Sequence, residues 1–146
     1  MSFRVIVKTN TGGEEFEIAK ECVKSVVFSS DIPQDSDART KDVGSSIMIK
    51  GKILTAVEDN LFDSTRGMAE WSVVPAEKAD CYRTLEIEHI AAGVVVRKYT
   101  FPNAFVVDYI EDFGDKEGTG LFTLLVKQKK DKIANIKIEG GYPAGV

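Results

Sequence analysis

The sequence contains few of the residues that form catalytic or metal centres. It has one histidine, His89, and two cysteines, Cys22 and Cys81. These residues are scattered, with neither the CxxC nor the HExxH spacing that places ligands around one zinc ion, so we expect no metal site of this kind. No motif typical of a cysteine protease surrounds either thiol, although a small hydrolase that pairs one of them with His89 stays an open alternative.

Two further features are missing: an excess of basic residues and any long apolar run. Lysine and arginine total 19 against 23 aspartates and glutamates, and the net charge of -4 argues against nucleic acid as a partner. No run approaches the roughly 18 apolar residues that span a bilayer, so we expect no membrane insertion. The N-terminal stretch MSFRVIVKTNTGG alternates polar and apolar residues and contains no apolar signal region. We therefore expect synthesis in the cytoplasm without a signal peptide, and reduced, partly buried cysteines.

The chain does contain enough apolar material for one core. Hydrophobic residues make up 43% of the 146 residues and charged residues 29%, which is typical of a folded globular chain. This length is close to the commonest size of one domain, and no linker, internal repeat or low-complexity tract divides it. We therefore expect a single domain over residues 1–146.

Apolar and polar residues alternate along most of the chain, which is typical of half-buried β-strands. Phe3, Val5 and Val7 begin the pattern on one face of the first strand. The alternation predicts strands at residues 3–8, 15–18, 23–29, 47–53, 82–90, 94–101, 105–111, 121–127 and 133–138. Turn residues predict three hairpins, in which the first two strands pair, 82–90 pairs with 94–101, and 105–111 pairs with 121–127. The tail at 140–146 is expected to fray.

One segment, residues 58–71, carries a helical apolar pattern. The residues that fall on one face at helical spacing are Leu61, Phe62, Thr65, Met68 and Ala69. Asp59 or Asn60 is in place to cap the N-terminus of this helix. About eight strands and one helix predict a mainly β fold, a compact antiparallel β-barrel or sandwich with the α-helix flanking its side or end.

Two polar segments superficially resemble ligand-binding loops. Residues 31–46 have little to bury and are expected to form a long loop or the tip of a protruding hairpin. Asp35 and Asp37 lack the remaining acidic positions and the glycine of a calcium-binding EF-hand, and Arg39 interrupts them. The glycine-rich residues 114–120 precede a strand and lack the Lys-Ser/Thr of a phosphate-binding loop. We therefore expect no metal and no cofactor.

Three stretches of the sequence resemble the Hcp (TssD) tube proteins of type VI secretion, which are similar in fold to contractile-phage tail-tube proteins. The stretches are MSFRVIVKTNTGGEEFEI, LFDSTRGMAEW and YTFPNAFVVDYIEDFGDKEGTGLFTLLVKQKK. In the third of them, Phe101, Asn103, Ala104 and Phe105 match the family's aromatic-flanked entry into a long hairpin. The resemblance covers most of the chain and implies a small barrel-like β domain with one flanking helix.

The resemblance also implies a function that explains the missing catalytic groups. A tube subunit acts through its surfaces, so the chain is expected to be a non-enzymatic structural protein that assembles into closed rings of six copies. The rings would form the inner tube of a contractile injection apparatus: a type VI injector, a phage-tail bacteriocin or a prophage tail. Sheath, spike or baseplate proteins and secreted cargo are the implied further partners, and the protein would be exported as part of the particle.

The charged residues of the long polar segment are the candidate contacts between copies. Asp35, Asp37, Arg39 and Asp42 fall where the family carries an extended loop that touches a neighbouring subunit. Opposite charges at such a contact can set the register between subunits. The alternative functions are a monomeric β-sandwich module that binds carbohydrate or a peptide strand and, less favoured, the small cysteine-dependent hydrolase.

Overall fold

The computed structural model shows a chain built mainly from antiparallel strands. The residues that it describes are 2–10, 15–31, 44–54, 56–57, 60–61, 64–114, 120–129 and 135–145. The strands are β1 (Ser2–Thr9), β2 (Phe16–Ile18), β3 (Val23–Asp31), β4 (Gly44–Ile53), β5 (Ala56–Val57), β6 (Asn60–Leu61), β7 (Arg83–Ala91), β8 (Val94–Phe113), β9 (Gly120–Gln128), β10 (Lys137–Glu139) and β11 (Tyr142–Pro143). The helical elements are α1 (Arg66–Ser72) and the 3-10 turns η1 (Lys20–Cys22) and η3 (Ala79–Cys81).

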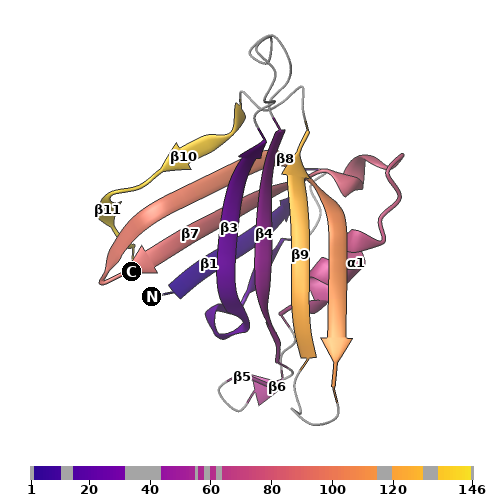
Figure 1. The fold of residues 1–146 in the computed structure, drawn as a ribbon, viewed down its shortest axis with the longest axis horizontal. Coiled ribbons are helices and arrows are strands. Elements are labelled where there is room, and N and C mark those ends of the chain that lie inside the picture. Colours follow the sequence, from indigo (N-terminus) through magenta and orange to yellow (C-terminus); the bar gives the residue numbers. More distant parts are fainter. Residues whose placement is uncertain are drawn as a thin grey trace.

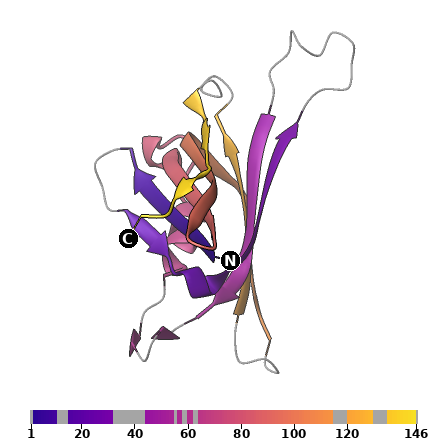
Figure 2. The same ribbon diagram turned by 90° about the vertical axis from the view of Figure 1, so that its left-hand side faces the viewer.

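Nine strands form one sheet that folds over into two layers. The strand order is β2-β1-β7-β8-β9-β4-β3, and β10 and β11 also pair with β8. The layers cross obliquely because the long strand β8 bends and contributes to both (Figures 1 and 2). We call β2, β1, β7 and residues 94–101 of β8 the back sheet, and residues 104–113 of β8, β9, β4 and β3 the front sheet. The predicted mainly antiparallel β fold with one flanking helix is confirmed.

The three predicted hairpins are all present. β1 pairs with β2, β7 with the first half of β8, and the second half of β8 with β9. The turn between β7 and β8 places Ala92 and Gly93 at φ of 52° and 74°, the left-handed region that tight hairpin turns require. The strand predicted at residues 133–138 is the shorter β10, and residues 133–134 lie outside the described part of the chain.

β8 is one continuous strand of 20 residues, where the sequence predicted two separate strands. The predicted break coincides with a change of partner, because the pairing with β7 passes from Phe101 to Ala104 and the pairing with β9 begins at Ala104. Pro102, which has no backbone N–H to donate, lies in this gap. Its carbonyl oxygen accepts hydrogen bonds from Asn10 Nδ2 at 2.9 Å and Thr84 Oγ1 at 3.2 Å. Side chains therefore hold the corner at which β8 passes from the back sheet to the front sheet.

The hydrophobic core lies between the two sheets. The back sheet contributes Val5, Val7, Leu85, Ile87 and Phe101, and the front sheet Ile47, Ile49, Phe122, Leu124 and Val126. All of these side chains are almost fully buried. Burial of one such side chain stabilises a fold by roughly 1.5 to 3 kcal/mol. Helix α1 adds Met68 and Trp71 to the same cluster.

The helix predicted at residues 58–71 is shorter than expected and begins later. Asn60–Leu61 form β6 and pair with Ala56–Val57 of β5, which takes them out of the helix. α1 begins only at Arg66, and its N-cap residue makes no side-chain capping bond. Asp59, one of the two predicted caps, lies outside the described residues. Within the described part of the chain, α1 is far shorter than a membrane-spanning helix, and no other helix has the length and apolarity to cross a bilayer.

The C-terminal segment pairs with β8, in contrast to the frayed tail expected from the sequence. β11 lies antiparallel to the start of β8, and the Gly141 N–H donates to the Val95 carbonyl oxygen at 2.8 Å. Gly140 allows this close approach, since a Cβ atom there would overlap the carbonyl oxygen of Val96. Gly141 has a φ of 80°, which glycine adopts without strain. Backbone pairing over a long sequence separation, which the local pattern does not contain, therefore orders this segment.

Candidate subunit interface

The front sheet ends in two free strand edges. In the described part of the chain, β3 pairs with β4 alone, and residues 105–113 of β8 pair with β9 alone. The β7 pairing of β8 ends at Ala104, and β10 and β11 lie against residues 94–100 (Figure 1). Each free edge presents a row of backbone N–H and C=O groups with which another strand can pair.

The two free edges lie on opposite sides of the front sheet and run in opposite directions. Each of its four strands is antiparallel to the next, so the second half of β8 runs antiparallel to β3. A second copy rotated to lie beside the first would bring its β3 antiparallel to the β8 of the first. The alternation of strand direction would then continue across the junction, with the hydrogen-bond geometry of an ordinary antiparallel pair.

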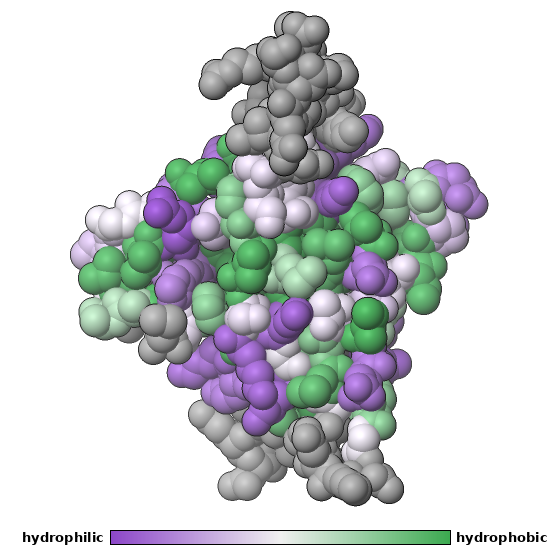
Figure 3. All heavy atoms as spheres, viewed as in Figure 1, coloured by the Kyte–Doolittle hydropathy of each residue, from purple (hydrophilic) through white to green (hydrophobic). Residues whose placement is uncertain are grey.

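Among the described residues, exposed apolar side chains lie at the start of β8, on β10 and β11, and on the front sheet. Those on the front sheet have exposed fractions between 39% and 65% and are Val27 on β3, Val107, Ile110 and Phe113 on β8, and Leu121 on β9. Figure 3 shows apolar residues beside charged ones on this face. Apolar side chains that collect on an otherwise polar surface often mark a contact with another protein. Two of the three strands that carry them, β3 and β8, are the edge strands.

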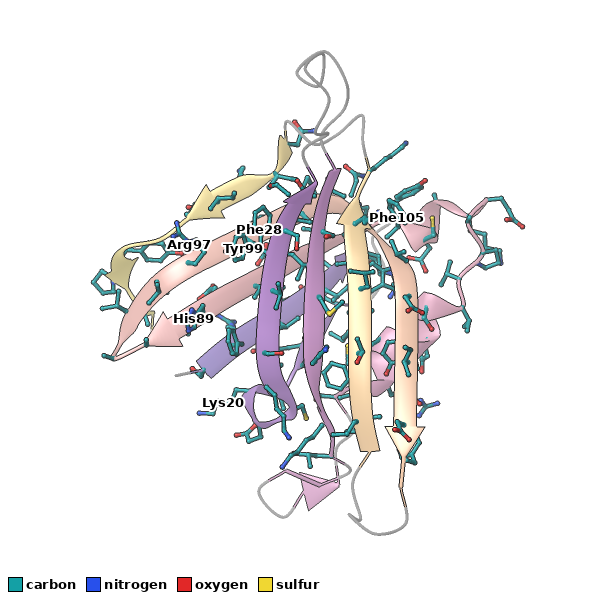
Figure 4. All side chains as sticks on the ribbon, viewed as in Figure 1. Lys20, Phe28, His89, Arg97, Tyr99 and Phe105 are labelled. Carbon is teal, nitrogen blue, oxygen red and sulfur yellow. The ribbon has the colours of Figure 1, made fainter. Side chains whose placement is uncertain are left out.

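On the β3 side, the back sheet extends past the free edge and carries basic and aromatic side chains. Phe28 of β3 stacks on Tyr99, and Phe3 stacks on His89, each with ring centroids 4.8 Å apart. Arg97 is exposed and lies opposite His89 in the β7–β8 pairing. Figure 4 shows Phe28 on β3, and His89, Arg97 and Tyr99 on the back sheet to the same side of the molecule. We call the following set the β3 ledge: Lys20, Lys24, Phe28, His89, Arg97 and Tyr99.

On the opposite side, the β8 edge is acidic. Asp108, Glu111 and Asp112 are exposed, and residues 104–113 contain no lysine or arginine. Glu111 accepts a hydrogen bond from the Tyr109 hydroxyl at 2.7 Å. Within the described residues, none of the three carboxylates forms an ion pair. We call Asp108, Glu111 and Asp112 the β8 acidic edge.

The side chains of both cysteines are buried. Cys22 and Cys81 are unpaired, in agreement with the predicted reduced state. Cys22 Sγ lies 3.7 Å from Ser64 Oγ, and Cys81 Sγ donates to the Ala76 carbonyl oxygen at 3.5 Å. Burial, followed by the nearby Asp80 carboxylate, raises the pKa of the Cys81 thiol and keeps it in its less reactive protonated form. Among the described residues, no histidines, cysteines and carboxylates gather into a group that could hold a metal ion.

The four residues that the sequence predicted as interface contacts lie outside the described part of the chain. They are Asp35, Asp37, Arg39 and Asp42. The β3 ledge and the β8 acidic edge were not predicted from the sequence. A signal was present, because three carboxylates occur within residues 108–112. Their position at a sheet edge follows from the order of strands in the sheet, which alternation along the chain does not define.

The sequence matches no protein-family model and no curated protein. The fold does resemble solved structures. Hcp1 from Flavobacterium johnsoniae is 17% identical over 99% of this chain and 100% of that chain, with a TM-score of 0.58. A chain of the anti-feeding prophage baseplate is 14% identical over 94% of this chain and 92% of that chain, with a TM-score of 0.57. A chain of the gene transfer agent tail is 12% identical over 94% of this chain and 95% of that chain, with a TM-score of 0.54.

Identities this low establish the fold and nothing finer. The similarity extends over nearly the whole of each chain. The resemblance to Hcp and tail-tube proteins predicted from the sequence is therefore confirmed at the level of structure: the chain has the fold of Hcp proteins and of chains in these two particles.

Proposed function

We propose that the chain is a non-enzymatic structural subunit that associates head to tail into closed rings, and that the rings form the inner tube of a contractile injection apparatus. The observation that carries this proposal is the pair of free, oppositely directed edges of the front sheet. Contacts between two different surfaces of identical subunits are heterologous and close into a ring when the rotation between neighbours divides a full turn. Addition of one edge strand to another supplies backbone hydrogen bonds across each contact.

We infer six copies in each ring. The anti-feeding prophage baseplate is described as sixfold symmetrised and the gene transfer agent tail as having C6 symmetry, and this chain shares the fold of a chain in each. The four strands of the front sheet are an even number, so antiparallel alternation continues around a ring of any size. The support for six copies therefore comes from these assemblies, and the support for head-to-tail contact comes from the strand edges.

The four charged residues that the sequence predicted as interface contacts are part of the same proposal. β3 and β4 pair up to Asp31 and Gly44, at one rim of the front sheet, where a stacked ring would lie. We propose that these four residues contact a neighbouring or a stacked copy; they are Asp35, Asp37, Arg39 and Asp42. Sheath, spike or baseplate proteins and secreted cargo are the proposed further partners, and the protein would leave the cell as part of the assembled particle.

Size-exclusion chromatography with light scattering tests the proposal. The purified protein is expected to have a mass of about 96 kDa, six times the 16.0 kDa of one chain, and to show rings in negative-stain micrographs. A variant with Cys22→Ala and Cys81→Ala is expected to form the same rings, because assembly uses no nucleophile. A monomeric binding module predicts a mass of 16.0 kDa. A protein that stays monomeric at high concentration would rule out the ring.

A further inference from the structure

The two sides of the front sheet that carry the free edges have opposite charge. The β8 acidic edge presents three exposed carboxylates and no basic residue. On the other side, Lys20, Lys24 and Arg97 of the β3 ledge are exposed, with Glu21 as the acidic neighbour on η1. Within the described residues, none of these three basic side chains forms an ion pair. Each side therefore has charges left to interact with another surface.

We propose that the β8 acidic edge of one copy lies against the β3 ledge of the next copy and that these opposite charges fix the register of the ring. The partner of the ledge is therefore a second copy of this chain. The inference rests on the proposed function, since it assigns the contact through which the ring closes.

The register within the front sheet places the two sets of charges at matching positions along the strand direction. Asp112 pairs with Leu121, and Leu121 pairs with Lys52 on β4. The neighbouring residue on β4, Gly51, pairs with Val23, which precedes Lys24. Asp112 and Lys24 therefore lie at the same end of the sheet. In a ring whose axis follows the strands, the two would lie on facing sides of one junction.

The middle of the junction shows the same complementarity. Asp108 pairs with Leu125, and Leu125 pairs with Met48, which is opposite Val27 of β3. Next to Val27, Phe28 stacks on Tyr99, two residues from Arg97. Figure 4 shows Arg97, Tyr99 and His89 on the part of the back sheet that extends past the free edge of β3. In the ring, Asp108 of one copy would therefore face the basic part of the β3 ledge of the next copy.

Backbone pairing alone leaves the register of such a junction undefined. Every residue of an edge offers the same N–H and C=O groups, so a strand that slips by two residues makes a similar ladder. Electrostatic complementarity contributes register and specificity more than affinity, and like charges brought together oppose association. The opposite charges of the β8 acidic edge and the β3 ledge therefore favour one register among those that the backbone hydrogen bonds allow.

A charge-swap experiment with two double variants tests the proposal. The edge variant is Asp108→Lys with Asp112→Lys, and the ledge variant is Lys24→Glu with Arg97→Glu. Each variant alone brings like charges together at every junction. The affinity between copies of that variant is therefore expected to fall by about tenfold or more. In an equimolar mixture the reversed edge of one variant meets the reversed ledge of the other, and the unchanged sides also match. Rings that alternate the two variants are therefore expected to form, and six places allow that alternation to close.

The matched control is Lys50→Glu with Lys52→Glu, which changes the charge by the same amount as the ledge variant but lies on the central strand β4. The control is expected to form rings as the parent does, and circular dichroism checks that every variant is folded. Parent-like rings from both variants, or no recovery in their mixture, would overturn the charge inference and leave the proposed ring intact. A monomeric parent would overturn both.

Discussion

Replacing Trp71 with alanine is expected to lower the free energy of unfolding by about 3 to 5 kcal/mol. The side chain is 1% exposed, and the Arg83 guanidinium lies over its ring, 5.6 Å from the centroid. Trp71 Nε1 also donates a hydrogen bond to the Cys81 carbonyl oxygen at 2.9 Å. Alanine would leave a cavity beneath α1 and a buried carbonyl oxygen without its donor. Urea unfolding followed by circular dichroism measures the change.

Two variants bracket this result. Trp71→Phe retains most of the ring volume but removes the N–H donor, so we expect a loss of about 1 to 3 kcal/mol. Val73→Ala follows the same helix at a side chain that is 77% exposed, and is expected to stay within about 0.5 kcal/mol of the parent. A Trp71→Ala protein with the unfolding midpoint of the parent would contradict the place of Trp71 in the core.

Replacing Gly51 with alanine is expected to cost about 3 kcal/mol, although the change adds one methyl group. A Cβ atom at Gly51 would overlap the backbone carbonyl oxygen of Cys22 and lie 2.8 Å from Phe122 Cε1. The backbone of Cys22 leads into β3 next to the irregular pairing between Val23 and Ser25. Relief of the overlap therefore requires β3 to move away from β4, which is the strand that holds it in the sheet.

The control for this prediction is Gly114→Ala, where nothing lies within 4 Å of an added Cβ atom. Its free energy of unfolding is expected to stay within about 0.5 kcal/mol of the parent. Thermal unfolding compares the two, and a loss of 3 kcal/mol in a chain of this size lowers the midpoint by roughly 6 to 12 °C. Equal midpoints for the two alanine variants would contradict the close approach of η1 to β4.

The strands of this fold were predictable because their alternation records which side chains face the core. Val5 and Val7 in β1 are fully buried, as are Ile47 and Ile49 in β4. The hairpin between β7 and β8 was also predictable, since a short turn with Gly93 separates two alternating runs. These features depend on neighbours in the sequence, and local patterns describe them well.

Features set by distant contacts were not predictable in the same way. The break expected near Pro102 is a corner inside one strand. Asn10, which follows β1, and Thr84 of β7 donate hydrogen bonds to the Pro102 carbonyl oxygen at this corner. Leu61 continues the helical spacing of α1, but its pairing with Ala56 in β5 removes it from the helix. The tail is ordered by its pairing with the start of β8.

The residues of the proposed interface were even harder to predict from local sequence patterns. The acidic residues of β8 are visible in the sequence, yet their meaning depends on β8 having a free edge on one side after Ala104. The β3 ledge joins residues from η1, β3, β7 and β8, among them Lys20, His89 and Arg97. No local pattern brings these together, because the sheet order does so.

The central claim is that β3 of one copy pairs with the second half of β8 of the next copy. Reconstruction of the purified ring by cryo-electron microscopy tests it most directly. The expected result is a sixfold ring in which these two strands run antiparallel, about 4.8 Å apart, and join the front sheets into one continuous sheet. A ring in which both edges face solvent, or in which copies meet through β2 or β11, would contradict the claim.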